Sequence, residues 1–405
     1  MTKFKKLTIS NWQQFKDITI DFHERMTVIT GANGSGKTTI LNILAQHFGW
    51  STNSIAVPRK NLATTLLEWF SGLFVRNETS IGEIVYNNDQ KATLLVPQVD
   101  SAQYSVKISG KQQVEGFIIP SHKTPFRYEQ VSNLSLRTSF DKEQAFSKVS
   151  SSIQSRYMGA GGQSSSFHMK EVLISWNILG YGNPKMAAKE ELLKNFNDFE
   201  KILSIILPEN IRFKNLEIRD FEIVFVCEQE NEFLLDAASG GISALTDLAW
   251  QIHMFSTDKR NNFVVLIDEV ENHLHPAMQR KVLHDLLLAF PKASFIVSTH
   301  SPLIVGSVKA SNVIALRYKD NKVYSEKLDL VNKPRTATEI LDEVLGVSFT
   351  MPVWAEEALK KITDTYLAKN TLTAEDLNSM RNELTEVGLG RLMPEAIYKI
   401  ATKND

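Results

Sequence analysis

The spacing of hydrophobic residues near the N-terminus predicts three short β-strands followed by a helix. Alternating hydrophobic positions predict one strand from Phe4 to Ile9 and a second from Phe15 to Ile20. Residues 27–30 form a run of β-favouring residues that is typical of a buried strand. A glycine-rich segment comes next, and apolar positions from Ile40 to Leu44 then predict a helix. Strand, glycine loop and helix is the order that a phosphate-binding loop requires.

The middle of the chain changes between strand and helix patterns. Four β-like runs between residues 81 and 120, the last at 116–120, predict an antiparallel sheet attached to the core. Helical spacing of hydrophobic residues predicts an inserted helical lid over 136–207. After residue 241 helices alternate with buried strands, which we expect at 263–268, 294–298 and 312–317. The sequence therefore predicts an α/β core with an added β subdomain.

These patterns divide the chain into four predicted parts. We expect an N-terminal lobe at 1–135 that carries the glycine loop and the β subdomain, followed by the lid at 136–207. A C-terminal lobe follows at 208–330, and the last part, 331–405, is predicted to be helical. Within it, Thr373-x-x-Asp376 is typical of a helix start.

Composition and charge limit the partners of the chain. Hydrophobic residues make up 43% of the 405 residues, enough for a packed core. The 45 basic and 46 acidic residues give a net charge of −1, which argues mildly against a protein that coats DNA. Because no apolar stretch approaches the ~20 residues that cross a bilayer, we expect a cytoplasmic protein with no membrane segment.

The glycine loop carries the first candidate chemistry. Residues 31–38 match G-x-x-x-x-G-K-[ST] in full. In such a loop backbone N–H groups surround phosphate oxygens, the lysine reaches the β- and γ-phosphates, and the hydroxyl ligates Mg²⁺. We therefore expect Lys37 and Thr38 in these roles. The residues predicted to bind ATP here are Asn33, Gly34, Ser35, Gly36, Lys37, Thr38 and Thr39.

An acidic pair predicts the other half of this site. Residues 264–267 are hydrophobic and typical of a strand buried on both faces, and Asp268 and Glu269 follow it directly. We expect Asp268 to bind Mg²⁺ and Glu269 to orient or deprotonate the attacking water. Acidic pairs after strands also begin ordinary helices, so the glycine loop favours the catalytic interpretation.

The motifs together resemble the ABC-type ATPases, within the branch that contains SMC, Rad50, RecF and OLD proteins. Residues 238–242 are similar to the signature motif of that family, although Ile242 stands where Gln or Glu is common. The resemblance implies that Ser239, Gly240 and Gly241 contact the γ-phosphate bound to the opposite subunit. It covers about residues 3 to 330.

The same resemblance assigns roles to three further segments. Residues 271–276 correspond to the D-loop, which runs across the dimer interface of the family, and His300 matches the switch histidine that contacts the γ-phosphate. The family also has a glutamine that senses Mg²⁺ and the γ-phosphate. Gln130 lies where the family places it, and Gln98 is the alternative.

The combination of motifs looks most like the stand-alone OLD-like bacterial AAA ATPases that lack a Toprim nuclease half. This resemblance implies a nucleotide-gated homodimer or higher oligomer that controls a partner effector, a nuclease, in anti-phage defence. The alternative is an ATP-dependent clamp of the RecF or SMC kind that binds DNA itself in DNA repair. The cofactors expected in both cases are ATP and Mg²⁺.

Overall fold

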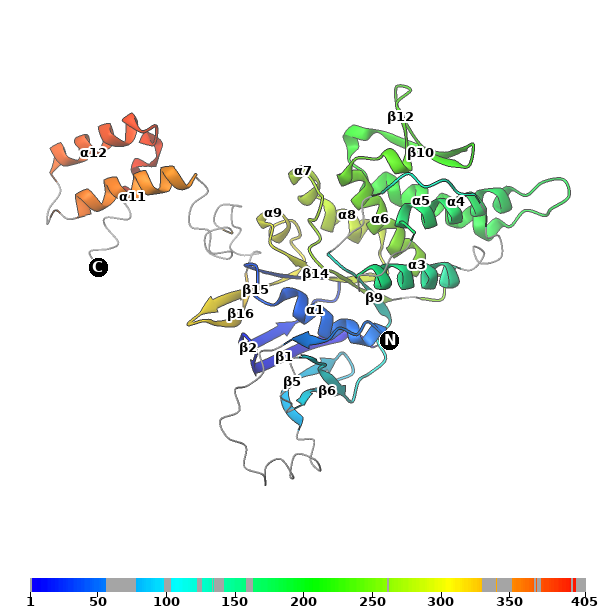
Figure 1. Ribbon diagram of the computed structural model, residues 1–405, viewed down its shortest axis with the longest axis horizontal. Coiled ribbons are helices and arrows are strands. Elements are labelled where there is room, and N and C mark those ends of the chain that lie inside the picture. Colours follow the sequence, from blue (N-terminus) through cyan, green and yellow to red (C-terminus); the bar gives the residue numbers. More distant parts are fainter. Residues whose placement is uncertain are drawn as a thin grey trace. The chain divides into compact units, whose positions relative to one another are not determined.

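The computed structural model describes two compact units of the chain, Met1–Ala337 and Thr338–Asp405 (Figure 1). The described residues are 2–55, 78–97, 103–121, 126–132, 134, 142–157, 163–260, 262–329, 340, 352–367, 369, 373–394, 396 and 397. The predicted boundary at residue 331 lies a few residues before the division between the two units.

A single mixed sheet organises the first unit. Among the described residues it has 11 strands, in the order β8–β6–β5–β1–β2–β16–β15–β3–β14–β13–β9. Its parallel strands are β9 (Gly116–Ile119), β13 (Phe263–Ile267), β14 (Ala293–Thr299), β3 (Met26–Gly31) and β15 (Asn312–Lys319). Its antiparallel strands are β1 (Phe4–Trp12), β2 (Phe15–Asp21), β5 (Glu78–Tyr86), β6 (Lys91–Pro97) and β8 (Lys107–Ser109). Strand β16 (Lys322–Leu328) joins the two parts, antiparallel to β15 and parallel to β2.

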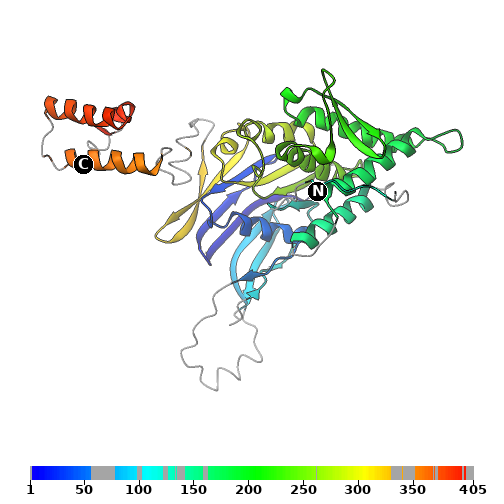
Figure 2. The ribbon, with the colours of Figure 1, turned by 45° about the horizontal axis from the view of Figure 1, so that its top comes forward.

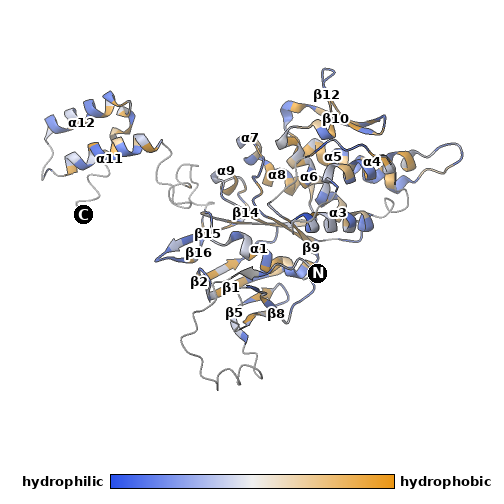
Figure 3. Cartoon of the chain, viewed as in Figure 1, coloured by the Kyte–Doolittle hydropathy of each residue, from blue (hydrophilic) through white to orange (hydrophobic). Residues whose placement is uncertain are grey.

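The parallel strands are buried along their length. Every residue of β3, β13 and β14 is buried, as expected for parallel strands covered on both faces. In Figure 3 the strands around β14 and β9 carry the colour of hydrophobic residues. Because parallel strands end at the same edge of a sheet, the residues that follow β3, β13 and β14 are brought together.

The prediction for residues 116–120 was wrong. Strand β9 belongs to the parallel core and pairs with β13, with Gly116 opposite Val264. A Cβ atom on Gly116 would lie 2.3 Å from the carbonyl oxygen of Val264, so this close approach requires glycine. The run that follows, Phe117 to Ile119, is buried. A short hydrophobic run of this kind does not by itself distinguish an antiparallel strand from a parallel one.

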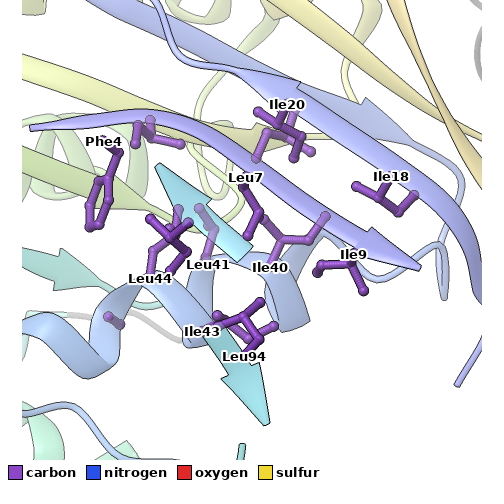
Figure 4. Packing of buried hydrophobic residues seen from close by; sticks show 14 of the residues in the cluster. Phe4, Leu7, Ile9, Ile18, Ile20, Ile40, Leu41, Ile43, Leu44 and Leu94 are labelled. Carbon is purple, nitrogen blue, oxygen red and sulfur yellow. The ribbon is translucent and has the colours of Figure 1, made fainter. Parts of the chain in front are cut away.

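Helix α1 (Lys37–Ala45) packs into the core between the glycine loop and the antiparallel strands. Ile40, Leu41 and Leu44 point toward Leu7 and Ile20 of the first two strands (Figure 4). The buried positions recur at the i, i+1 and i+4 spacing of one helix face. This packing fixes the start of the helix, where the glycine loop ends.

The lid consists of α3 (Lys142–Tyr157), α4 (Ser165–Tyr181) and α5 (Glu190–Ile206), drawn in green in Figure 2. Helix α5 buries one hydrophobic face, which includes Phe196, Phe199 and Leu203. The ring of Phe199 meets Trp250 of α6 (Gly240–Phe255) edge to face, with centroids 5.1 Å apart. A small sheet of β10 (Phe213–Arg219), β11 (Glu222–Cys227) and β12 (Glu232–Leu234) lies between the lid sequence and α6 in chain order.

Short elements complete the first unit. The helices are α7 (Pro276–Gln279), α8 (Val282–Ala289) and α9 (Pro302–Val305). The 3-10 turns are η1 (Gln46–Phe48), η2 (Glu209–Ile211) and η3 (Leu235–Ala237), and β4 (Ser54–Ile55) pairs with β7 (Gln103–Tyr104). In the part of the chain that the structure describes, no helix is long and apolar enough to span a bilayer.

The described residues of the second unit are helical, as predicted. It contains α11 (Val353–Leu367), α12 (Ala374–Glu386) and the turn η4 (Gly390–Leu392). Thr373 caps α12 in a reciprocal capping box with Asp376, which confirms the predicted helix start. Buried Leu359, Met380 and Leu384 contribute to a small core of its own.

Candidate nucleotide site

The predicted motifs meet at the carboxyl edge of the parallel strands. Strand β3 ends in the glycine loop, β13 ends before Asp268, and β14 ends before His300. Because β14 pairs in parallel with both β3 and β13, the three ends are neighbours. In open α/β sheets ligands bind at this edge.

All three glycines of the loop have positive φ angles, beginning with Gly31 at 148°. Gly34 and Gly36 have φ angles of 79° and 96°, in the left-handed region. A Cβ atom on Gly36, which caps α1, would lie 2.3 Å from Cζ of Phe15. Tyr318 on β15 donates a hydrogen bond from its hydroxyl to the carbonyl oxygen of Gly34 over 2.8 Å. No sequence pattern predicts this contact, because Tyr318 lies 284 residues after Gly34 in the chain.

The Lys37 side chain lies inside the loop. Its Nζ donates hydrogen bonds to the carbonyl oxygens of Gly31 and Ala32 over 2.7 and 3.1 Å. Burial lowers the pKa of Lys37, and the nearby carboxylates of Glu269, Glu271 and Asp268 oppose that shift. A phosphate would offer the ammonium group a stronger acceptor than these two carbonyls.

Thr38 and Asp268 are direct neighbours. The Thr38 hydroxyl lies 2.9 and 3.1 Å from the two carboxylate oxygens of Asp268, and Ser298 Oγ donates to one of them over 2.5 Å. Burial raises the pKa of Asp268, while the hydrogen bonds from Ser298 and Thr38 act in the opposite direction. A hydroxyl and a buried carboxylate are the oxygen ligands that Mg²⁺ takes beside phosphates. This donor set fits the ion that the motifs imply.

Glu269 is held in a defined orientation. Its φ of 48° is unusual for a residue with a side chain, and its backbone N–H donates to Ser298 Oγ over 2.8 Å. Asn272 Nδ2 donates to Oε2 of Glu269 over 2.9 Å and to the carbonyl oxygen of Ser121 over 3.1 Å. Sequence reasoning missed Ser298 and Asn272 as partners of the acidic pair. Asn272 lies in the segment that corresponds to the D-loop, and Ser298 ends the strand predicted at 294–298.

His300 is paired with Glu271. The backbone N–H of His300 donates to Oε1 of Glu271 over 2.7 Å, and the ring Nδ1 lies 3.0 Å from the same oxygen. The Glu271 side chain is 5% exposed and that of His300 is 46% exposed. Because a carboxylate oxygen can only accept, Nδ1 carries a proton in this contact, and Nε2 remains for a ligand.

The signature residues open to solvent at the start of α6. Ser239 is the N-cap of this 16-residue helix and makes no side-chain capping hydrogen bond among the described residues. A Cβ atom on Gly240 would meet nothing within 4 Å, whereas one on Gly241 would lie 2.8 Å from Sδ of Met278. At Ser239 and Gly240 the helix therefore presents its N-terminus, the positive end of its dipole, to solvent.

The two glutamine candidates have different outcomes. Gln98 lies outside the described residues. Gln130 is exposed, and the carbonyl oxygens of Arg127 and Glu129 just before it accept hydrogen bonds from Ser166 and Lys170 of α4. The strand that lies beside Asp268 is β9. It ends at Ile119, whose carbonyl oxygen accepts a hydrogen bond from the Asp268 N–H over 2.9 Å. The hydrogen bonds from Ser166 and Lys170 therefore anchor the segment of Gln130 to the lid.

Known proteins resemble the chain over most of its length. It is 24% identical over 376 residues to the Septu protein PtuA of Bacillus thuringiensis, which covers 88% of this chain and 87% of that protein. It is 21% identical over 384 residues to the Retron Vc95 probable ATPase of Vibrio cholerae serotype O1 biovar El Tor, with 77% and 73% covered.

Solved structures also match. The SMC head domain of Thermotoga maritima is 15% identical, with a TM-score of 0.43 and coverage of 81% of this chain and 99% of that one. The Smc head domain of Pyrococcus furiosus bound to the C-terminal domain of ScpA is 16% identical, with a TM-score of 0.45 and coverage of 85% and 100%. The family model described as AAA domain matches residues 6–284. The chain belongs to the AAA domain family of ATPases.

Proposed function

We propose that the protein is an ATP-gated homodimer in which each nucleotide binds between two chains. The phosphate loop, Asp268, Glu269 and His300 of one chain would hold one side of the nucleotide, and Ser239 to Gly241 of the second chain the other. Closing the dimer with ATP and opening it after hydrolysis would switch the activity of a partner effector.

One observation carries this proposal. Ser239 and Gly240 are exposed at an open helix N-terminus, with no side-chain cap on that helix among the described residues. Such a terminus attracts anions. The residues clustered around Lys37 already provide a phosphate loop, a metal ligand pair and a candidate base within one chain. A second anion-binding element that faces outward is what a site shared between two copies requires.

Each residue of the first side has a chemical task in this proposal. Lys37 and the loop N–H groups bind phosphate oxygens, and Thr38 and Asp268 hold Mg²⁺, which would neutralise phosphate charge. Glu269 orients the attacking water and accepts its proton. His300 directs a ring nitrogen toward the γ-phosphate while Glu271 holds the opposite nitrogen.

Solution mass with and without nucleotide tests this function. Glu269→Gln keeps the shape of the side chain and removes its basicity, so we expect it to bind ATP without hydrolysis and to double in mass. Lys37→Ala should stay at its original mass with ATP. If Glu269→Gln keeps one mass with and without ATP, whether that of a monomer or of a larger assembly, the nucleotide gate is wrong.

The effector is the second part of the proposal. Its support is the likeness to Septu protein PtuA and to a retron ATPase, together with the resemblance to OLD-like ATPases that act in anti-phage defence beside a nuclease. The protein purified from native expression should carry this partner, and Glu269→Gln with ATP should change the yield or the nuclease activity of the complex. Purification that returns the chain alone under both conditions would contradict an effector.

A further inference from the structure

Lys170 is a buried lysine that contacts three separate segments. It lies in α4, and its side chain is fully buried. Its Nζ donates to Oδ2 of Asp236 over 2.5 Å, to Oε2 of Glu222 over 3.0 Å and to the carbonyl oxygen of Glu129 over 2.5 Å. An ammonium group has three donors, and all three have acceptors here.

The three acceptors belong to elements far apart in the sequence. Asp236 lies in η3, three residues before Ser239, and its side chain is 2% exposed. Glu222 begins β11. Glu129 belongs to the connecting segment, residues 126–130, that links the sheet to the lid and ends at Gln130. Lys170 thus joins the loop before the signature to the segment that carries the candidate sensing glutamine.

Helix α4 also contacts the signature helix α6 itself. Ser165, at the start of α4, donates a hydrogen bond to Asp247 in the second turn of α6. Asp247 also accepts from Gln251 Nε2 over 2.8 Å. Helix α4 therefore contacts the signature helix at Asp247 through Ser165, and it contacts the loop before that helix at Asp236 through Lys170.

We propose that Lys170 is a positioning residue that fixes the signature loop to the connecting segment of its own chain, so that Ser239 is presented correctly to nucleotide bound by the second chain. This inference rests on the proposed shared site. It predicts that loss of Lys170 damages the neighbour's nucleotide site and leaves the phosphate loop of its own chain able to bind ATP. An effect on the neighbour's site that spares the phosphate loop of the same chain distinguishes this positioning role from a general structural one.

Mixing variants tests that direction. Lys170→Met and Lys37→Ala should each lose ATPase activity at least roughly tenfold when pure. In a 1:1 mixture, the Lys170→Met chain supplies an intact phosphate loop and the Lys37→Ala chain an intact signature loop. The mixture should recover between about a quarter of the wild-type rate, if dimers form at random, and about half, if only the mixed dimers close, because each mixed dimer has one complete site of two.

Three variants serve as controls. Ser239→Glu places a negative charge where the γ-phosphate of the second chain's nucleotide would lie. A carboxylate is tolerated at a helix N-terminus, so the variant should fold. It should complement Lys37→Ala in the same way as Lys170→Met. Lys148→Met removes another lysine of the lid, which pairs with Glu171 at 2.9 Å, and should keep nearly wild-type activity. Asp236→Asn keeps the size of the side chain and weakens its bond to Lys170, which provides a milder version of Lys170→Met.

The outcomes distinguish the positioning role of Lys170 from the proposed shared nucleotide site. A fluorescent ATP analogue should bind Lys170→Met as it binds wild type, which shows that the chain is folded. Should that variant fail to bind, Asp236→Asn takes its place in the mixture. If Ser239→Glu complements Lys37→Ala but neither Lys170→Met nor Asp236→Asn does, Lys170 does not act on the neighbour's site. If Ser239→Glu also fails to complement, the shared site is wrong and this inference with it.

Discussion

Asn272 holds the carboxylate of Glu269 within its own chain, through a hydrogen bond of 2.9 Å from Nδ2 to Oε2. The same amide reaches the carbonyl oxygen of Ser121 over 3.1 Å. Asn272 belongs to the segment that corresponds to the D-loop, which in the proposed dimer lies at the contact between chains. The candidate base is therefore coupled to the surface that assembly would rearrange.

Replacing Asn272 should lower turnover and leave ATP binding almost unchanged. In Asn272→Ala the Glu269 carboxylate loses a side-chain partner, so we expect kcat to fall roughly tenfold, a part of what general-base catalysis supplies. Steady-state kinetics with varied ATP measure both quantities. A variant that raises KM for ATP while kcat stays constant would show that Asn272 serves nucleotide binding instead.

Ser298 should matter for both stability and the metal. Its Oγ donates to Asp268 over 2.5 Å and accepts the Glu269 N–H over 2.8 Å. Ser298→Ala leaves a buried donor and acceptor without this partner, so urea unfolding should show a loss of about 1–3 kcal/mol. We also expect ATP hydrolysis to require more Mg²⁺.

The matched control lies at the other end of the same strand. Ser294 is also buried in β14, and its Oγ donates to the carbonyl oxygen of Glu24 over 2.7 Å. Ser294→Ala should lower stability without any change in the Mg²⁺ requirement. Equal effects of the two variants on the metal titration would remove the special role assigned to Ser298.

Glu271 and His300 should act as a unit. Oε1 of Glu271 accepts from the His300 backbone N–H, and the ring Nδ1 lies 3.0 Å from it, so Glu271→Gln disturbs the orientation of the ring. In a double-mutant cycle with His300→Ala we expect a coupling of about 1–2 kcal/mol in kcat/KM. Fully additive losses would mean that Glu271 acts independently of His300.

The pH dependence of stability should reflect His47. Burial lowers its pKa to about 4, and its ring nitrogens contact the Leu44 carbonyl oxygen and the Tyr86 hydroxyl at 2.9 and 2.8 Å. The unfolded chain binds a proton near pH 6.5 and the folded chain does not, so stability falls as pH falls between these values. The slope from His47 alone is about 1.4 kcal/mol per pH unit.

Denaturant unfolding at several pH values checks this contribution. His47→Gln should flatten the slope between pH 6.5 and about 4.5 by nearly that amount, whereas His284→Gln, at an exposed position, should leave it unchanged. Burial also lowers the pKa of His253, which acts in the same direction and is present in both variants. A slope that does not change in His47→Gln would contradict the assignment.

Much of the fold follows from local patterns. Hydrophobic spacing predicted the strands and helix around the glycine loop, because β3 is fully buried and α1 buries one face. Residues 116–120 were assigned to the wrong part of the sheet, because parallel or antiparallel pairing depends on partners distant in sequence. The strand β16, which joins the two parts of the sheet, was not predicted.

The candidate site also has a part that the sequence predicts and a part that it does not. Lys37, Thr38 and Asp268 were singled out by motif; Thr38 hydrogen-bonds Asp268, whose carboxylate acts on the pKa of Lys37. The contacts of Ser298, Asn272 and Tyr318 depend on which strand ends become neighbours, so the sequence alone did not indicate them. Lys170 carries no motif at all. Its burial with two carboxylates becomes visible only in three dimensions.

ATPase activity after mixing Lys37→Ala with Ser239→Glu tests the central claim most directly. Each variant removes one side of the proposed shared site, so neither should hydrolyse ATP when pure. If nucleotide binds between two chains, the mixture regains between about a quarter and about half of the wild-type activity, depending on whether dimers form at random or only the mixed dimer closes. A mixture that stays as inactive as its components, although both chains are folded and associate, would show that the signature residues do not act on the second chain's nucleotide.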